Sequence, residues 1–181
     1  MKKEHIKISK FLSLVLRHKP DVIGLKLDEN GWALIDELIC CAAAGGRSLD
    51  RELIKEVVAT NDKKRFSISP DGKMIRANQG HSINVDLGLS PIMPPTTLYH
   101  GTATRFLESI LQKGLRSSGR NHVHLSSDHE TAVNVGQRHG KPVVLKVESG
   151  AMDSDGHVFY RSENGVWLTK LVPAKYLQVI R

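Results

Sequence analysis

Cysteine is scarce in this 181-residue chain, and long apolar runs are absent. No apolar stretch approaches the roughly 20 residues that cross a bilayer, and no signal-peptide core follows the basic start. We therefore expect a cytoplasmic protein without membrane association. The only two cysteines, Cys40 and Cys41, are adjacent, so on a helix they would point about 100° apart and pair poorly. Zinc-ligand spacings such as Cys-x-x-Cys or His-Glu-x-x-His do not occur, so no metal is expected.

The balance of charge is basic, with 26 Lys and Arg against 19 Asp and Glu, a net charge of +7. Such an excess suits a polyanionic partner such as a nucleic acid, although many basic proteins bind none. The segment Leu87–Thr97 has three prolines and little charge, and no internal repeat is visible. We interpret it as a linker between two domains, residues 1–90 and residues 91–181.

The first half has the pattern of three helices followed by a hairpin. Apolar residues recur at helical spacing from residue 8 to residue 16, and further helices are predicted in 33–46 and 48–62. Ser48 and Asp50 are both candidates to cap the third helix. The run "RFSISPDGKMIRA" alternates around a Ser-Pro-Asp-Gly turn, which predicts a β-hairpin. Helices followed by such a hairpin are typical of a winged-helix module.

The second half alternates short apolar strands with helices that end in glycine. Strands are predicted around residues 97–101, 123–126, 142–147, 157–161, 166–169 and 176–180, and helices in 104–114 and 127–140. This pattern predicts an α+β domain built on a mainly antiparallel sheet.

Two basic elements in the first half are candidates for binding an anion. Arg17 and His18 end the first helix, where cations also serve simply to compensate the helix dipole. Lys63, Lys64 and Arg65 enter the hairpin strand, where lysines also protect a sheet edge from pairing. An arginine at this position is suited to grip a phosphate through two parallel hydrogen bonds.

Two further elements lie in the second half. His100-Gly101-Thr102 stands between a strand and a helix, so Gly101 would let a ligand approach the backbone, and Thr102 or Thr104 would cap the helix. A strand-to-helix turn without a ligand explains the same residues equally well. Further on, Arg120 precedes "NHVHLS", whose two histidines share a strand face and raise the question of a metal site.

Taken together and in order, these motifs resemble the NAD-dependent RNA 2′-phosphotransferases, the tRNA 2′-phosphotransferase family. The resemblance rests on "LRH", "KKRF", "HGT" and "RNHVHLS", and extends through 135–147 and "NGVWLT". It implies an N-terminal winged-helix lobe that binds RNA and a C-terminal lobe of ADP-ribosyltransferase type that binds NAD. The catalytic residues implied by matching motifs are Arg17, His18, Arg65 and Arg120. The implied NAD-binding residues are His100, Gly101, Thr102, Gly114 and Ser126.

The family reaction implied by this resemblance has two steps. An internal RNA 2′-phosphate attacks the nicotinamide ribose of NAD and expels nicotinamide, which gives a 2′-phospho-ADP-ribosylated RNA. The ribose hydroxyl then attacks the phosphorus, leaving 2′-hydroxyl RNA and ADP-ribose 1″,2″-cyclic phosphate. The first step needs alignment of an anionic nucleophile, and the second needs proton movement, for which His18 is the titratable member of the set.

Two alternatives stay open from the sequence. One is a winged-helix regulator that binds nucleic acid without catalysis, and the other is stable ADP-ribosylation of a terminal nucleic-acid phosphate. By analogy the RNA is a tRNA, as in tRNA splicing, although a compact chain could have this activity without any splicing pathway that makes 2′-phosphates. The absence of a heptad pattern favours a monomer. Arg138 suits a pyrophosphate, but no role is assigned to it.

Overall fold

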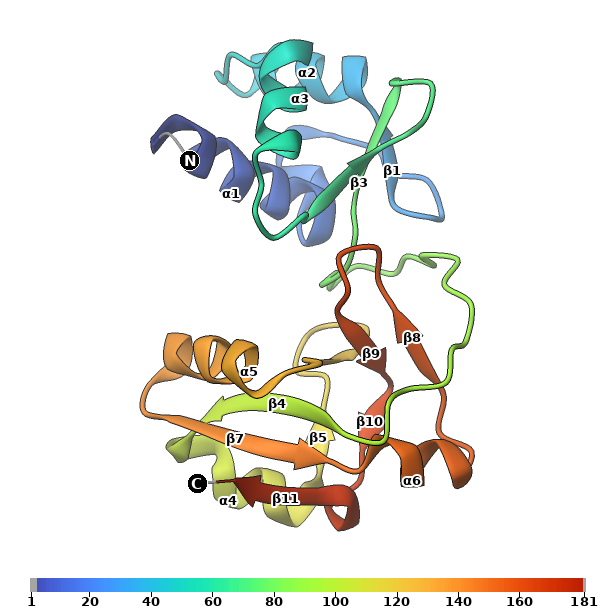
Figure 1. The fold of residues 1–181 in the computed structure, drawn as a ribbon. Helices are drawn as coiled ribbons and strands as arrows, with labels where there is room; N and C mark the ends of the chain where they lie inside the picture. The colour runs from blue at the N-terminus through green and yellow to red at the C-terminus, as the bar shows by residue number, and fades with distance from the viewer. Residues whose placement is uncertain (1–2, 181) are drawn as a thin grey trace. The chain divides into compact units, whose positions relative to one another are not determined.

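In the computed structural model, residues 3–180 are described, and they form two compact units that divide between Gly88 and Leu89. This division falls within the predicted linker. The first unit contains α1 (Lys3–Arg17), η1 (Pro20–Ile23), β1 (Trp32–Leu34), α2 (Ile35–Ala44), α3 (Arg51–Ala59), β2 (Phe66–Ile68) and β3 (Met74–Ala77). Its strands form an antiparallel sheet in the order β1-β3-β2 (Figure 1).

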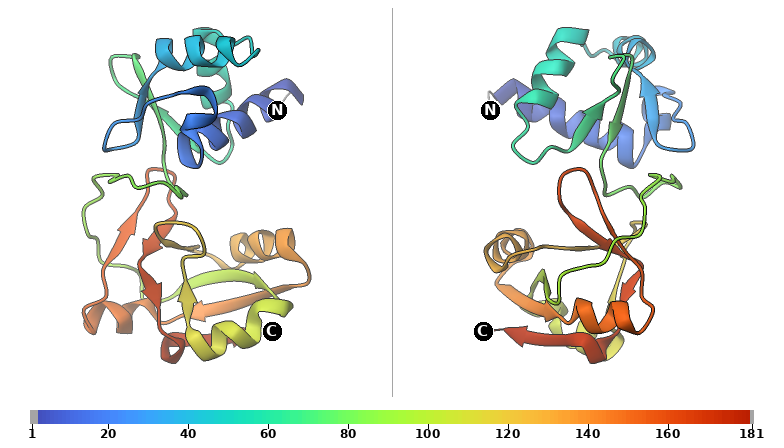
Figure 2. Two further views of the ribbon diagram at one scale, coloured as in Figure 1. Left: turned by 180° about the vertical axis from the view of Figure 1, so that it is seen from behind. Right: turned by 45° about the vertical axis from the view of Figure 1, so that its right-hand side comes forward.

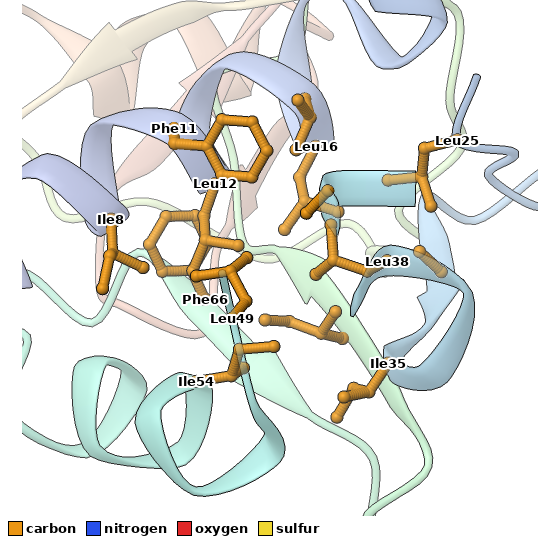
Figure 3. Packing of buried hydrophobic residues seen from close by; sticks show 14 of the residues in the cluster. Ile8, Phe11, Leu12, Leu16, Leu25, Ile35, Leu38, Leu49, Ile54 and Phe66 are labelled. Carbon is orange, nitrogen blue, oxygen red and sulfur yellow. The ribbon is translucent and has the colours of Figure 1, made fainter. Parts of the chain in front are cut away.

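The core of the first unit explains why α1 forms. Its apolar residues recur three and four positions apart, so they share one face of a helix. That face is buried against α2, α3 and the hairpin, as Figure 3 shows for Phe11, Leu12, Leu38, Ile54 and Phe66. The helix ends at Arg17 because Pro20 follows, and the amides of His18 and Lys19 both donate to the carbonyl of Leu14.

The other predicted elements of the first unit are confirmed in type, and η1 and β1 are additions. Asp50 caps α3 by accepting a hydrogen bond from the amide of Leu53 at 2.8 Å, and Gly45 ends α2. The hairpin pairs Phe66 with Ala77 around a turn at Gly72. Strand β1 was not predicted, because three residues are too few to show an alternating pattern, and its residues Ala33 and Leu34 were wrongly expected to begin the second helix.

The second unit contains β4 (Leu98–Ala103), α4 (Thr104–Lys113), β5 (Leu115–Arg116), β6 (Val123–Leu125), α5 (His129–Gly136) and η2 (Gln137–His139). It continues with β7 (Pro142–Val147), α6 (Ser149–Ser154), β8 (Phe159–Arg161), β9 (Trp167–Thr169), β10 (Leu171–Val172), η3 (Ala174–Tyr176) and β11 (Leu177–Ile180). Its described sheets have the orders β11-β7-β4, β6-β9-β8 and β10-β5, and all their pairs are antiparallel. The expected α+β class is confirmed.

Helices cover the β11-β7-β4 sheet of the second unit. Figures 1 and 2 show α5 across one side of β4 and β7 and α4 on the other. Two backbone hydrogen bonds between Tyr99 and Ser126, of 2.9 and 2.8 Å, join this sheet to the end of β6. Within residues 3–180, no helix combines the length and the apolar character needed to cross a bilayer.

Candidate active site

Arg17 lies at the C-terminal end of α1, directly after the fully buried Val15 and Leu16. Its Nη2 donates to the carbonyl of Arg65 at 3.2 Å, and its guanidinium carbon lies 5.7 Å from the centre of the Phe66 ring. The side chain therefore reaches from α1 to the start of β2. Two of the predicted catalytic arginines, 48 positions apart in the sequence, are in direct contact.

His18 is held by the segment that follows the hairpin. Its Nδ1 lies 2.9 Å from the Ser82 hydroxyl, while the amide of Ser82 donates to the carbonyl of Arg17 at 2.9 Å. Ser82 therefore binds both the backbone and the ring at the end of α1. Sequence reasoning did not identify Ser82, because no pattern connects residues so far apart in the chain.

Arg65 is positioned by Asn61, a second residue that sequence reasoning missed. The Asn61 side chain is 2% exposed. Its Oδ1 accepts hydrogen bonds from Nη1 of Arg65 at 3.3 Å and from the amide of Lys63 at 3.2 Å. Its Nδ2 donates to the hydroxyl of Ser9, on α1, at 3.1 Å. The amide thus ties the 61–65 turn to the helix that carries Arg17 and His18.

A groove of about 510 Å³ lies between α1 and the 61–65 turn. His18 and Arg65 both line it, with Ile6, Ser9, Lys10, Ser13, Leu14, Asp62 and Lys63. Its cationic side chains outnumber its one carboxylate, so the groove is suited to an anionic ligand. The first unit thus brings together Arg17, His18 and Arg65, which sequence reasoning predicted as a group.

A buried histidine lies beneath this cluster. His81 is 2% exposed, and its Nε2 has no hydrogen-bond partner among the described residues. Burial, followed by the positive charges of Arg17, His18 and Arg76, lowers the pKa of His81 to about 4. His81 is therefore neutral at neutral pH and does not add to the positive charge around Arg17.

In the second unit, His100 projects from β4 and is fixed by a backbone carbonyl. Its Nδ1 lies 3.0 Å from the carbonyl oxygen of His124, so Nδ1 carries the proton and donates. Burial lowers the pKa of His100, which keeps the ring neutral. In this tautomer Nε2 is a hydrogen-bond acceptor. Ser126 is close by, because its backbone pairs with that of Tyr99.

Close packing between β4 and α5 explains why the His-Gly-Thr motif has glycine at position 101. A Cβ at Gly101 would lie 1.7 Å from the carbonyl oxygen of Ala132 on α5. On the helix side, a Cβ at Gly136 would lie 2.6 Å from the carbonyl oxygen of Thr102. The backbones of β4 and α5 therefore touch through two glycines. The neighbour that requires glycine at position 101 is a helix, and ligand contact at Gly101 stays a prediction.

The expected threonine cap of α4 is wrong. The N-cap position is Ala103, with no side-chain hydrogen bond, because β4 continues to Ala103 opposite Pro142 before the helix begins. Thr102 is part of the strand and is 5% exposed. Gly114 has a φ of +75° and packs against the carbonyl of Val172, which accounts for glycine there without a ligand.

Arg120 belongs to the second unit and lies in the loop before β6, with an exposed side chain. Nearby, the His122 ring packs edge-on against Tyr160, with ring centres 5.8 Å apart, and burial lowers its pKa. Within residues 3–180, no group of three or more His, Cys, Asp or Glu is arranged to hold a metal ion.

Comparison with known proteins identifies the family. Residues 3–171 match the model of "RNA 2′-phosphotransferase, Tpt1 / KptA family". A probable RNA 2′-phosphotransferase of Acaryochloris marina is 62% identical over 169 residues, which cover 93% of each chain. Its counterpart in Pectobacterium carotovorum is 58% identical over 96% of this chain and 94% of its own, and that of Agrobacterium fabrum is 59% identical over 94% and 92%. At this identity and coverage, the chain belongs to the RNA 2′-phosphotransferase family.

Proposed function

We propose that this protein removes an internal 2′-phosphate from RNA by transferring it to NAD. The observation that carries the proposal is the contact between Arg17 and Arg65, with His18 and Arg65 lining one groove. Three basic groups converge there on a single region from two places in the chain. A dianionic phosphate is the ligand that such a cluster binds best.

The first unit is the RNA-binding lobe in this proposal, with winged-helix architecture. Three helices packed on an antiparallel hairpin support this assignment. The second unit is the NAD-binding lobe, of ADP-ribosyltransferase type. Its α+β composition and the clustering of His100 and Ser126 support that role. Arg120 contributes the fourth phosphate-binding group from the second unit.

The residues of the second unit fit NAD. With Nδ1 donating to the His124 carbonyl, His100 presents Nε2 as an acceptor for a ribose hydroxyl. The hydroxyl of Ser126 and the residues Gly101 and Thr102 complete the proposed set. NAD supplies an electrophilic ribose carbon with a good leaving group.

The basic residues then have distinct tasks. Arg17, Arg65 and Arg120 hold the phosphate and fix its orientation, which lowers the barrier because the anionic oxygen needs alignment rather than deprotonation. In the second step the ribose hydroxyl loses a proton and the RNA 2′ oxygen gains one, and His18 assists this proton movement. Its Nδ1 lies 2.9 Å from the Ser82 hydroxyl, and this contact orients the ring at the end of α1.

The direct test incubates the protein with NAD and a 2′-phosphorylated oligonucleotide. We expect release of nicotinamide together with a 2′-hydroxyl product. A persistent ADP-ribose adduct would instead indicate phosphate ADP-ribosylation, and an untouched oligonucleotide would indicate a binding protein without catalysis.

Single substitutions test the assignment of Arg65. Arg65→Ala is expected to lower kcat/KM by about 100-fold or more, as loss of a transition-state donor does in other enzymes. Arg65→Lys should recover little, because a lysine cannot form two parallel hydrogen bonds. Arg47→Ala is the control, since Arg47 is exposed and stacks on Phe11 away from the groove-lining residues. Equal losses at Lys63, Lys64 and Arg65 would indicate a diffuse basic patch.

A further inference from the structure

The outward side of α1 has an ordered row of side chains, and the proposed chemistry uses only the last of them, His18. Ile6, Lys10, Leu14 and His18 follow one another at intervals of four residues, so they form one ridge along the helix. The ridge is about 18 Å long at a rise of about 1.5 Å per residue. Ile6 is 44% exposed and Leu14 is 38% exposed, although helix surfaces facing water usually carry polar residues here.

This ridge lines the groove that ends at the proposed phosphate-binding residues. His18 occupies the C-terminal end of the ridge, and Arg65 lines the groove from the other wall. Between them and the start of α1, the helix lines the groove with Leu14, Lys10 and Ile6 of the ridge and with Ser13 and Ser9 beside it. The volume of about 510 Å³ lies within the range of roughly 300–1,000 Å³ that small-ligand sites occupy. Ile6 and Leu14 give this wall apolar surface, Lys10 lies between them, and Lys63 also lines the groove. This combination matches a nucleotide, which has an apolar base face and a negative backbone.

We infer that this groove binds the RNA nucleotide next to the phosphorylated one, with its base against Ile6 and Leu14. Lys10 and Lys63 then lie beside the RNA backbone. The inference rests on the proposed function, because the covalent chain places a neighbouring nucleotide beside any phosphate held at His18 and Arg65. A base lying on aliphatic side chains is read by its flat face, so binding is independent of base identity. It also requires an unstacked, single-stranded neighbour.

The test combines an altered RNA with an altered protein. The RNA is a 2′-phosphorylated oligonucleotide with an abasic ribose at the neighbouring position, made separately for the 5′ and the 3′ neighbour. The protein is Ile6→Gln with Leu14→Gln. We expect one of the abasic RNAs to lower kcat/KM of the wild type by about 5- to 10-fold, at the low end of the loss caused by removing a stacked base. On intact RNA, kcat/KM of the double variant should be lowered by the same factor as that of the wild type on the abasic RNA. Giving the double variant that abasic RNA should cause no further loss.

Leu34→Gln is the matched control, since Leu34 is also an exposed leucine of the first unit and does not line the groove. It should retain wild-type kcat/KM and full sensitivity to the abasic substitution. Independent, multiplying losses from the abasic RNA and the double variant would overturn the inference, as would wild-type activity on both abasic RNAs. If the wild type releases no nicotinamide with intact RNA, the proposed function itself fails, which is a separate result.

Lys10 provides a second measurement that does not alter apolar residues. For Lys10→Ala, the slope of log binding constant against log salt concentration should become shallower by about 0.7, the value for one phosphate contact on a single strand. Lys26→Ala, which removes another exposed lysine of the first unit, should leave the slope unchanged. Equal slopes for wild type and Lys10→Ala would place the RNA backbone elsewhere.

Discussion

The two units position their candidate residues by different means. In the first unit, side-chain hydrogen bonds hold charged groups in place: Arg17 binds the Arg65 carbonyl, and Asn61 binds the Arg65 guanidinium. In the second unit one side-chain bond, from His100 to the His124 carbonyl, is joined by backbone contacts: β4 touches α5 through Gly101, and Tyr99 pairs with Ser126. In the first unit, positively charged groups lie close together, so hydrogen-bond acceptors are needed between them. In the second unit, the position of β4 depends on close backbone packing against α5. Substitutions in the two units should therefore differ in how they affect stability and activity.

The largest expected effect is loss of the backbone contact in the second unit. Gly101→Ala places a methyl group 1.7 Å from the Ala132 carbonyl oxygen, so β4 and α5 must separate. We expect a cost above about 4 kcal/mol, or failure to fold, because the obstacle is backbone that cannot rotate away. Thermal or urea unfolding measures it.

Gly45→Ala is the control for that substitution. Gly45 has a φ of −84°, and a Cβ there would lie 3.4 Å from the carbonyl oxygen of Ala42, so alanine should change stability by less than about 1 kcal/mol. A Gly101→Ala protein with wild-type stability would show that β4 and α5 are not in tight contact.

The next effect concerns acid sensitivity in the first unit. His81 has a folded-state pKa of about 4, whereas an unfolded histidine titrates near 6.5. Between these values the unfolded chain binds more protons, so stability is complete above about pH 6.5 and falls as the pH decreases toward 4. The total loss is on the order of 3 kcal/mol.

His81→Gln should flatten this dependence, which urea unfolding at pH 7 and pH 4 would measure. Burial also lowers the pKa of His100 in the second unit, so part of the acid sensitivity should persist there. An unchanged pH slope in His81→Gln would show that His81 is protonated in the folded protein or already exposed.

The hydrogen-bonded arrangement of the first unit depends on Asn61. Asn61→Ala removes the acceptor for Arg65 and the partner of the buried Ser9 hydroxyl, so we expect about 1–3 kcal/mol of destabilisation. We also expect about a tenfold loss of kcat/KM, because Arg65 is less well aligned. Asn61→Asp keeps the acceptor and should restore most of the activity without restoring all of the stability.

Asn30→Ala is the matched control, because the Asn30 amide donates to the Asp86 carbonyl at 2.8 Å but does not contact Arg65. It should lower stability slightly and leave kcat/KM unchanged. Equal activity losses in Asn61→Ala and Asn61→Asp would mean that Asn61 supports the fold without orienting Arg65.

The predictable part of this molecule is the part with local signals. Apolar spacing predicted α1 and α3, Asp50 predicted a helix start, and the Ser-Pro-Asp-Gly turn predicted the hairpin. Strands β1, β5 and β10 and helix α6 were missed, because two or three residues, or six without a clear stripe, carry no readable period. The β5–β10 pair joins residues far apart in the chain, with Val172 opposite Leu115 and Leu171 opposite Arg116.

The candidate site divides in the same way. Arg17, His18 and Arg65 were predicted from motifs, and the structure places them together in the first unit. Asn61 and Ser82 were not, since a supporting amide or hydroxyl has no motif of its own. The reason for Gly101 was also out of reach, because it depends on where α5 packs.

The smallest effects come from a feature that the units share, and they sharpen the comparison. Asp50 caps α3 and Asp128 caps α5, accepting from the amides of Leu53 and Thr131 at 2.8 and 2.7 Å. Each change to alanine should cost about 1 kcal/mol in unfolding measurements. The cap bonds lower the pKa of Asp128, so its contribution is lost as the pH falls through that lowered value.

Their effects on activity should differ even though their effects on stability match. Helix α5 packs directly on the strand that carries His100, so Asp128→Ala should raise KM for NAD modestly, by about twofold. Asp50 caps the N-terminal end of α3, whereas the 61–65 turn follows the C-terminal end of that helix. Helix α3 also belongs to the first unit, so Asp50→Ala should leave KM for NAD unchanged. If both variants change KM for NAD equally, the start of α5 does not position the NAD-binding residues of β4. The two units would then differ in how they fold but not in how their helix caps affect NAD binding.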